Sequence, residues 1–247
     1  MNAKIENQEI FEQEVKKVCQ VYLDAEKNER NGIHTASTDE QTGIQALERI
    51  APNQPMEPGK VERIEYEYER HGTTCLFGNK NVATGEIIAP KLHPTRTEED
   101  FAENIDAVVA TDPAAGWIFV LDNLNTHVSA TLVFLVALLC DIPFEGLGVK
   151  GKSGILKDKE SRKRFLEDES HRIRFVYTPK HCSWLNQIEN WFSGLSRRVL
   201  KRGSFASVDE LNAKIRDYIK FYNETARPMD WKYDGTQKSE TKTANII

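Results

Sequence analysis

The stretch that most constrains the fold is the apolar run Trp117–Leu121, which ends abruptly at Asp122. Five consecutive apolar residues are too few for a buried helix, and their aromatic and β-branched side chains are typical of a strand covered on both faces. The polar residues Asn123 to His127 follow, and then a helix-like apolar segment over 130–139. An acid at the carboxyl end of a central strand lies where α/β sheets place their chemistry. The alternative is that Asp122 only caps the next helix.

The remaining hydrophobic periodicity predicts helices and strands on both sides of this run. Ahead of it we expect an amphipathic helix over 6–30, with Ile10, Phe11, Val15, Val18, Val21 and Tyr22 on its inward face. A short strand over 33–39 should end at Asp39, and an irregular connection should follow around 52–59. We then expect antiparallel strands within 61–88 and a helix over 97–109 that is capped by Thr97. After it we expect a strand over 172–177, a long helix from Ser183 to about Lys201, and a helix over 208–222. The order predicts an α/β protein with a mixed sheet flanked by helices.

Length and composition are those of a globular protein with one large domain. Of the 247 residues, 39% are hydrophobic and 29% are charged. We expect a lead-in helix over 1–30, a main domain over 31–225 and a polar tail over 226–247.

No apolar run is long enough to cross a membrane, and the N-terminus does not resemble a signal peptide, so a cytoplasmic location is expected. The four cysteines form no Cys-x-x-Cys pair, which argues against a zinc site and for reduced thiols.

The charge distribution suggests a nucleic-acid partner, although the net charge of −5 does not. Residues 1–115 carry 12 Lys and Arg against 22 Asp and Glu, a net of −10, whereas residues 150–202 carry 14 against 6, a net of +8. A basic block inside an acidic chain is the electrostatic pattern of a phosphate-binding surface. The alternative is a solvated face of a helical insertion.

Three acids stand out by their positions. Asp39 ends the first predicted strand, Asp122 ends the central one, and Glu189 lies in the first turns of the helix after the last strand. Three converging carboxylates repel one another and are expected to bind Mg²⁺ or Mn²⁺ through oxygen. Two such ions about 4 Å apart can activate water or a 3′-hydroxyl and stabilise the leaving oxygen of a phosphodiester. Among 38 acidic residues, position alone is weak support for one chosen trio.

Stronger support comes from motifs that resemble a known family. Residues 121–127 (Leu-Asp-Asn-Leu-Asn-Thr-His) resemble the second-aspartate motif of the mariner-like transposases. Residues 177–189 resemble their third-acid motif, in the version found in the bacterial insertion sequence 630 family. Residues 38–46 resemble the first-aspartate segment of that branch, and Arg70-His71-Gly72-Thr73 its following strand. The resemblance covers roughly residues 30–235. It implies a ribonuclease H-like fold with a DDE metal site formed by Asp39, Asp122 and Glu189.

The chain departs from that family pattern in two places. Glu189 lies 67 positions after Asp122, a long spacing that we attribute to an insertion over about 140–171 before the last core strand. The second departure concerns the N-terminus. Family members normally carry helix-turn-helix domains that recognise the element's ends, and the roughly thirty residues before the first strand do not form such domains. We therefore expect a catalytic domain alone, with a helix-turn-helix part encoded upstream or lost.

Several other side chains are weaker candidates for the site. His127 is expected to contact DNA or to orient Asp122, and Asn123 and Asn186 to hydrogen-bond the carboxylates; ordinary turn or cap roles are the alternatives. Trp184 and Trp191 are interpreted as packing residues, with base stacking by Trp184 as a lesser alternative. We expect two groups of basic residues to hold DNA. The insertion contributes Lys150, Lys152, Lys157, Lys159, Arg162, Lys163 and Arg164, for which binding to a second protomer is the alternative. The helix after the last strand contributes Arg197, Arg198, Lys201 and Arg202.

The sequence thus predicts the catalytic domain of a cut-and-paste DNA transposase that uses two Mg²⁺ or Mn²⁺ ions. The resemblance implies a TA dinucleotide target, a homodimer, and a nucleoid-associated location in bacteria. One alternative is a nuclease of the same fold that is not tied to element ends. The other is an inactive remnant that binds DNA or a partner through its basic block; the intact acids at all three positions argue against decay.

Overall fold

A mixed five-stranded sheet forms the centre of the protein. The computed structural model describes residues 8–52, 54–63, 65–201 and 203–236. The strands lie in the order β3-β2-β1-β4-β5. β1 pairs antiparallel with β2 and parallel with β4, β4 pairs parallel with β5, and β2 pairs antiparallel with β3. Their bounds are Ile33–Arg49 (β1), Tyr68–Asn81 (β2), Lys91–His93 (β3), Gly116–Leu121 (β4) and Ile173–Tyr177 (β5).

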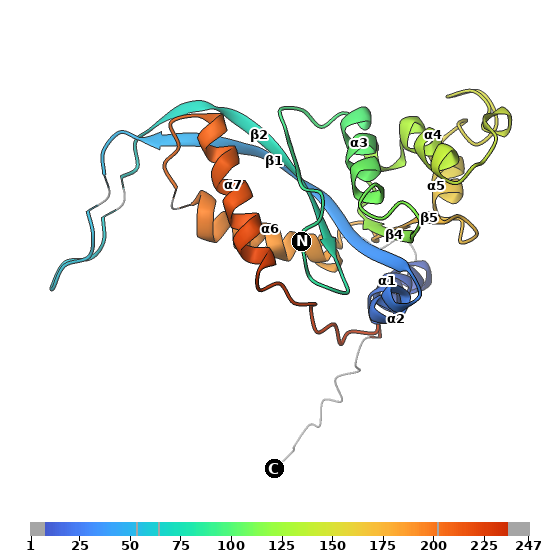
Figure 1. Ribbon diagram of the computed structural model, residues 1–247, viewed down its shortest axis with the longest axis horizontal. Helices are drawn as coiled ribbons and strands as arrows, with labels where there is room; N and C mark the ends of the chain where they lie inside the picture. The colour runs from blue at the N-terminus through green and yellow to red at the C-terminus, as the bar shows by residue number, and fades with distance from the viewer. Residues whose placement is uncertain (1–7, 53, 64, 202, 237–247) are drawn as a thin grey trace, which may run out of the picture.

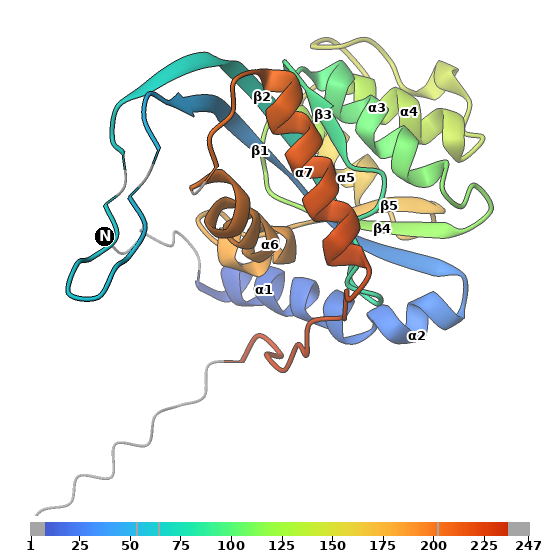
Figure 2. The same ribbon diagram turned by 60° about the vertical axis from the view of Figure 1, so that its left-hand side comes forward.

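Helices cover both faces of this sheet (Figures 1 and 2). α3, α4 and α5 pack on one face, and α1, α6 and α7 pack on the other. The predicted α/β class with a helix-flanked mixed sheet is therefore confirmed. The helix bounds are Gln8–Leu23 (α1), Ala25–Arg30 (α2), Glu98–Val109 (α3), Ala130–Leu139 (α4), Lys159–Leu166 (α5), Gln187–Leu195 (α6) and Val208–Asn223 (α7).

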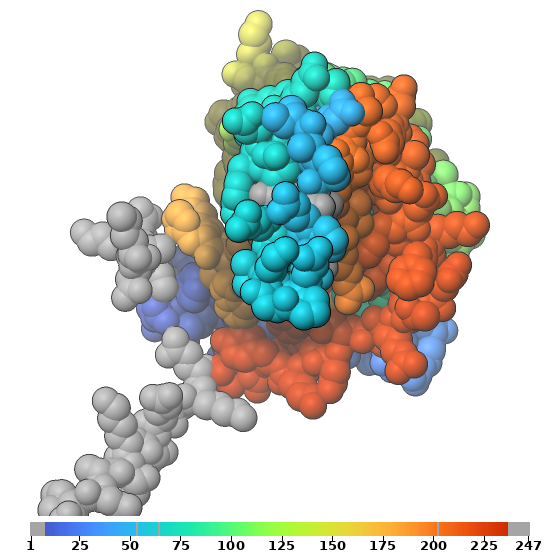
Figure 3. Space-filling view, turned by 90° about the vertical axis from the view of Figure 1, so that its left-hand side faces the viewer, coloured from blue at the N-terminus to red at the C-terminus, as the bar shows by residue number. Residues whose placement is uncertain are grey.

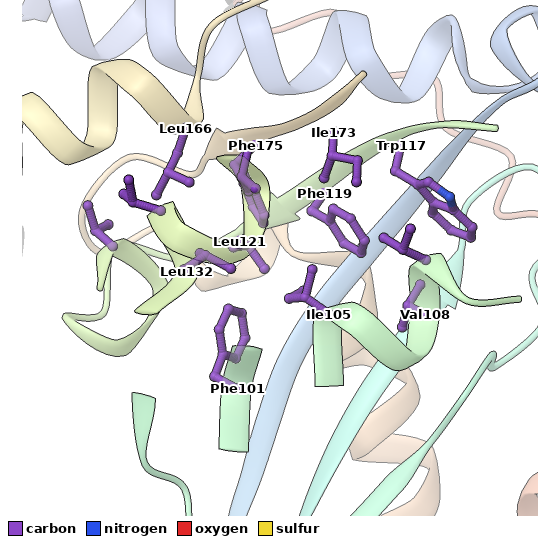
Figure 4. Close-up of a cluster of buried hydrophobic side chains, with 14 of the residues drawn as sticks. Phe101, Ile105, Val108, Trp117, Phe119, Leu121, Leu132, Leu166, Ile173 and Phe175 are labelled. Carbon is purple, nitrogen blue, oxygen red and sulfur yellow. The ribbon is translucent and has the colours of Figure 1, made fainter. Parts of the chain in front are cut away.

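The apolar run of β4 divides its side chains between the two layers. Trp117, Phe119 and Leu121 face α3 and α4, where Phe119 stacks between Trp117 and Phe175 of β5 (Figure 4). Ile118 and Val120 face α1 on the opposite side. All five are at most 2% exposed, because successive strand residues point to opposite faces and both faces are covered. The prediction of a central strand buried on both sides is confirmed.

β1 is longer than predicted, which changes the position of Asp39. The strand runs to Arg49, and Asp39 lies inside it, opposite Gly78 of β2. The parallel pairing with β4 nevertheless ends at Ser37, because β4 itself ends at Leu121. Asp39 is thus the first charged residue on β1 beyond its contact with β4, although it does not end the strand.

Two further strand predictions between residues 61 and 88 are wrong. Residues 82–88 form a turn and an isolated bridge, and the third strand is Lys91–His93. Of residues 61–67, 61–63 and 65–67 are described; they belong to a narrow hairpin extension that projects from the body (Figure 1) and faces the viewer in Figure 3. Val61 and Tyr66 are 79% and 85% exposed, so their β-propensity has no layer to pack against.

The terminal helices differ from prediction in detail. The first helix is divided at Asp24, and Ile10 is exposed although it was expected on the inward face. The helix expected from Ser183 starts instead at Gln187, after a 3₁₀ turn over Ser183–Leu185, and ends in a π-helical turn over Ser196–Leu200. Thr97, by contrast, caps α3 as predicted and forms a capping box with Asp100.

The segment between α4 and β5 is part of the main core. It contains α5, and it buries Leu147, Leu156 and Leu166 against the cluster formed by α3 and α4. Of the predicted tail 226–247, residues 226–236 are described, and Trp231 packs on Tyr22 of α1. Among the described residues, no helix is long and apolar enough to cross a membrane.

The ring of His34 links β1 to two acidic side chains, which makes stability depend on pH. Its two nitrogens each lie 3.0 Å from a carboxylate oxygen, one of Glu29 and one of Asp112. Burial lowers the pKa of His34, but the two carboxylates outweigh burial and raise it above its usual value. The stabilisation is therefore complete below the unfolded-state pKa of about 6.5 and is lost as the pH rises through the folded-state pKa.

We therefore predict that His34→Gln lowers Tm by about 2–4 °C near pH 6, which corresponds to roughly 1 kcal/mol for partly exposed pairs. The Tm difference between the wild type and the variant should shrink as the pH rises toward 9, because His34 of the wild type then loses its charge. Thermal unfolding followed by circular dichroism at the two pH values measures this. A Tm difference that does not change with pH would contradict the assignment.

Candidate active site

Asp39 is held by a buried hydrogen-bond network between β1 and the start of α6. Asn186 Nδ2 donates to Asp39 Oδ2 and to the Thr38 carbonyl, both at 3.1 Å. The Ser37 hydroxyl donates to Asn186 Oδ1 and accepts from Ile188 N at 2.9 Å. Ser37 and Asn186 are at most 1% exposed. Asn186 does not cap α6 with its side chain, because that side chain is committed to Asp39.

The start of α6, which carries Glu189, is positioned by the close packing of this helix on β2. Gly78 lies opposite Asp39, and a Cβ at this position would lie 2.7 Å from the ring of Phe192. Only glycine therefore lets the helix pack this closely on the strand. Glu189 lies in the first turn of α6, one turn before Phe192, and its side chain is partly exposed.

Asp122 follows β4 and is oriented by His127, as one sequence interpretation predicted. His127 Nδ1 lies 2.7 Å from Asp122 Oδ1, and the backbone N of Leu124 donates to the same oxygen at 2.9 Å. The other ring nitrogen of His127 lies 3.0 Å from Glu40 Oε2. The ring is fully buried and packs on Phe101 of α3 with centroids 4.2 Å apart.

The charge state of His127 follows from these two carboxylates. Burial lowers the pKa of His127, but the hydrogen bonds and charges of Asp122 and Glu40 outweigh it and raise the pKa to about 10. The ring is therefore protonated at neutral pH and donates from both nitrogens. The pKa of Asp122 shifts in the opposite direction. Partial burial raises the pKa of Asp122, but the hydrogen bond and charge of His127 outweigh burial and hold this pKa below its usual value.

The pKa shifts of the other two acids indicate that the three carboxylates share one electrostatic environment. Burial raises the pKa of Asp39 to about 7; His127 opposes this shift, and the negative charge of Asp122 adds to it. Burial and the same Asp122 charge also raise the pKa of Glu189. Asp122 thus acts on an acid from β1 and an acid from α6. The sequence-predicted trio comes from three elements that meet at this edge of the sheet.

This arrangement fits a divalent cation. Among the described residues, none of the ion pairs within 4.0 Å involves Asp39 or Glu189, and His127 compensates the charge of Asp39 only in part. The ligand atoms of Asp39, Glu40 and His127 lie within 4.8 Å of one another, and so do those of Glu48, Glu69 and His71 farther along the β1–β2 hairpin. Carboxylate oxygens are the ligands that Mg²⁺ and Mn²⁺ prefer.

Glu40 is the site residue that sequence reasoning missed. Its side chain is 2% exposed, and it points to the α3 side of the sheet, whereas Asp39 beside it points to α6. Strand alternation predicts only that Glu40 faces the side opposite to Asp39, and not that His127 lies there. The distance of 87 positions between Glu40 and His127 hides this pair in the sequence.

The other predicted site residues have separate roles in the structure. Asn123 Nδ2 donates to the Thr178 carbonyl at 2.6 Å and so ties the loop after β4 to the loop after β5. Lys159 Nζ donates to the Asn123 carbonyl and to Asn125 Oδ1, which holds its charge near Asp122. Trp191 is buried, as expected for a packing residue, whereas Trp184 is 57% exposed.

The basic block of residues 150–164 is partly used for structure. Arg162 Nε donates to the Val128 carbonyl, Lys150 pairs with Glu98, and Lys163 lies over the ring of Tyr177. Lys152, Lys157 and Arg164 are exposed, with Arg164 4.0 Å from Glu160.

A second group of predicted basic residues lies next to Glu189. Arg197 and Lys201 line a cleft of about 650 Å³ together with Glu40, Glu189 and Ser193. Arg198 is exposed on the same π-helical turn, and Arg202 lies outside the described residues. The cleft therefore combines the third acid with two cationic side chains, a pairing that suits a phosphodiester approaching a metal ion.

Comparison with known families identifies this arrangement. A family model described as the DDE superfamily endonuclease matches residues 35–212, which contain all three acids. The chain belongs to this family. No curated protein matches the chain.

Solved structures of the Mos1 transposase share the fold of this DDE endonuclease domain. The crystal structure of the Mos1 mariner paired end complex with Mn matches with a TM-score of 0.52 at 14% identity, over 87% of this chain and 56% of that one. The Mos1 paired-end complex with the left transposon end gives 0.50 at 14%, over 89% and 57%. The Mos1 catalytic domain with Raltegravir and Mn gives 0.50 at 12%, over 87% and 84%. The chain spans little more than half of the transposase in the two complexes, and the ribonuclease H-like fold predicted from the sequence is confirmed.

The buried pair Glu40–His127 in this DDE domain yields a prediction for stability. His127→Leu leaves Glu40 buried without a positive partner, which should cost about 3–5 kcal/mol. Asp122 is 36% exposed and can regain water, so it adds little to that cost. Urea unfolding measures the loss.

The double variant Glu40→Leu/His127→Leu is the matched control. It removes both buried charges and should recover most of the lost stability. A double variant as unstable as the single one would show that shape, rather than the unpaired charge, causes the loss.

Proposed function

We propose that this chain is the catalytic domain of a cut-and-paste DNA transposase of the insertion sequence 630 branch of the mariner-like superfamily. The observation that carries the proposal is that the charge of Asp122 raises the pKa of both Asp39 and Glu189, acids that come from β1 and α6. Membership in the DDE endonuclease family and the likeness to the Mos1 catalytic domain support it.

We propose that these three carboxylates would hold divalent metal ions, Mg²⁺ or Mn²⁺, and that two ions bind, as the family resemblance implies. When bound, such ions supply Lewis-acid chemistry that makes water or a 3′-hydroxyl a better nucleophile and stabilises the leaving oxygen of a phosphodiester. The Mos1 catalytic domain has been solved in the presence of Mg or Mn, which agrees with this choice of metal.

The protein's own contribution is to position these acids before metal and DNA arrive. Asn186 and Ser37 orient the Asp39 carboxylate from the α6 side, and His127 orients Asp122 from the α3 side. Because both networks are buried, the acids lose little conformational freedom on binding. Arg197 and Lys201 border Glu189, where they attract the phosphate backbone and balance its charge.

The proposed partners are DNA element ends and a TA-containing target, bound by a homodimer in the bacterial nucleoid. We propose that a helix-turn-helix module acts together with this domain to recognise the ends. The proposed substrates agree with the Mos1 structures, which are described as complexes with transposon ends and as a strand transfer complex.

The first test replaces Asp122 with Asn, which keeps the shape of the side chain and its contact with His127. We predict that metal-dependent nicking and strand transfer on labelled DNA fall by more than about 1,000-fold, because the loss of one metal ligand removes several kcal/mol of transition-state stabilisation. Mn²⁺ binding measured by calorimetry should weaken in the same variant while the Tm stays near that of the wild type.

Glu48→Gln is the matched control, because Glu48 belongs to the second group of potential ligands with Glu69 and His71. It should leave Mn²⁺ binding and cleavage unchanged. If Glu48→Gln loses metal binding and Asp122→Asn does not, the functional metal lies on the hairpin and the proposed site is wrong. DNA binding without any cleavage, even with a helix-turn-helix protein supplied, would favour an inactive remnant.

A second test concerns the basic block. Replacing Lys152, Lys157, Lys163 and Arg164 with Ala should weaken DNA binding and lower the slope of log Kd against log salt by up to about 3.6, since each phosphate contact contributes about 0.9. Replacing Lys27, Lys60, Lys214 and Lys220, which lie outside this block, is the charge-matched control. Equal salt slopes in the two quadruple variants would contradict a DNA-binding role for the block.

A further inference from the structure

The first helix and the segment after the last helix pack on each other on the α6 side of the sheet. We call residues 224–236 the C-terminal strap; it runs past α1 (Figure 2). Trp231 of the strap packs on the ring of Tyr22 in α1, with centroids 4.9 Å apart. Gly235 lies so close to α1 that a Cβ at this position would be 2.8 Å from the Lys16 Cα. The strap therefore helps to fix the position of the Tyr22 ring.

The hydroxyl of Tyr22 reaches the turn that leads into α6. Tyr22 is 4% exposed, and its hydroxyl donates to the Leu185 carbonyl at 2.8 Å in a buried contact. Burial raises the pKa of Tyr22, whereas hydrogen bonding by the Ser37 side chain and by the Gln187 backbone acts in the opposite direction. One hydroxyl from α1 therefore contacts β1 and the residues on both sides of Asn186.

This turn matters because Asn186 orients an acid of the candidate site. Asn186 stands between the 3₁₀ turn Ser183–Leu185 and α6, and its own backbone is extended, with φ −83° and ψ 106°. Regular helix geometry therefore does not set its orientation. From this position its amide group donates to Asp39 Oδ2 and accepts from the Ser37 hydroxyl. The orientation of the Asp39 carboxylate thus depends on how the backbone of this turn is held, and Tyr22 holds it from the α1 side.

We propose that Tyr22 is a positioning residue of the metal site. Its hydroxyl fixes the Leu185–Asn186 turn, and Asn186 holds the Asp39 carboxylate in its metal-binding orientation. This inference rests on the proposed function, because it takes Asp39 to be a metal ligand. Removing a group that orients a metal ligand typically weakens metal binding by about 10–100-fold. Because Tyr22 acts one contact farther out than Asn186, the lower end of that range is expected for its hydroxyl.

The proposal gives a role to two parts of the chain that lie outside the matched catalytic core. Tyr22 and Trp231 both lie outside residues 35–212, which the DDE endonuclease model matches. The sequence predicts only a lead-in helix and a polar tail for these two parts. If they were no more than that, the loss of one hydroxyl from α1 would leave metal binding unchanged.

Tyr22→Phe is the decisive variant, because it keeps the ring against Trp231 and removes only the hydroxyl. Calorimetry on the full chain measures Mn²⁺ binding at the site that Asp122→Asn weakens, and the Kd of Tyr22→Phe should rise by about 10-fold. Tyr222→Phe is the matched control. It also removes a hydroxyl that donates to a carbonyl, that of Gly85 at 3.2 Å, but this contact does not involve the turn before α6. Its Kd for Mn²⁺ should equal that of the wild type.

A double variant tests whether Tyr22 acts through Asn186. Asn186→Ala removes the amide that Tyr22 is proposed to direct, so Tyr22→Phe should change the Kd by less than about 2-fold further when it is added to Asn186→Ala. Effects of the two substitutions that multiply in full would mean that Tyr22 influences the metal by another route. That result would overturn the proposal.

A merely structural tyrosine would give a different set of results. Tyr22→Phe would then lower the Tm and leave both the Mn²⁺ Kd and the NMR signal of the Asn186 side-chain amide in EDTA unchanged, which would overturn the proposal. We expect instead that this amide signal shifts in Tyr22→Phe and stays in place in Tyr222→Phe. Because the expected defect lies in metal affinity, excess Mn²⁺ should restore DNA nicking by Tyr22→Phe.

The same measurements separate this inference from the proposed function. Wild-type cleavage together with an unchanged Mn²⁺ Kd in Tyr22→Phe would refute the positioning role and leave the transposase proposal standing. Mn²⁺ binding that depends on Tyr22 in a protein that never cuts DNA would support the positioning role and count against the transposase. A wild type that binds no Mn²⁺ would overturn both.

Discussion

Repulsion among the carboxylates at one edge of the sheet is the constraint to which the rest of the site is adapted. The charge of Asp122 raises the pKa of Asp39 and of Glu189, and one buried imidazolium, His127, lies within 3.0 Å of Glu40 and Asp122. Buried side chains hold these acids in place by hydrogen bonds. Keeping several carboxylates close together and partly buried lowers the stability of the folded protein.

The fold follows from the sequence where periodicity and burial agree. The apolar run before Asp122 predicts β4 because both of its faces are covered, and the cap at Thr97 predicts α3 because it satisfies backbone groups locally. The hairpin is different: Val61 and Tyr66 have strand propensity, yet no helix covers them. The prediction of β1 was too short because Glu40 and Gln41 are polar, which suggested the end of a strand. In the structure these two residues are covered by elements from distant parts of the chain, and the strand continues.

The candidate site was predictable only as far as its motifs extend. Asp39, Asp122 and Glu189 are visible as acids at the ends of predicted elements and by resemblance. Their supports are not visible, because Ser37 meets Asn186, and Glu40 meets His127, across separations of 149 and 87 positions.

The long reach of the Ser37–Asn186 contact has a consequence for synthesis of the protein. Within this domain, the strand that carries Asp39 is synthesised well before the residues that orient it, which follow 149 positions later. Domains complete their packing only when all their elements are available, so the three acids can be held in their final positions only after α6 has been made.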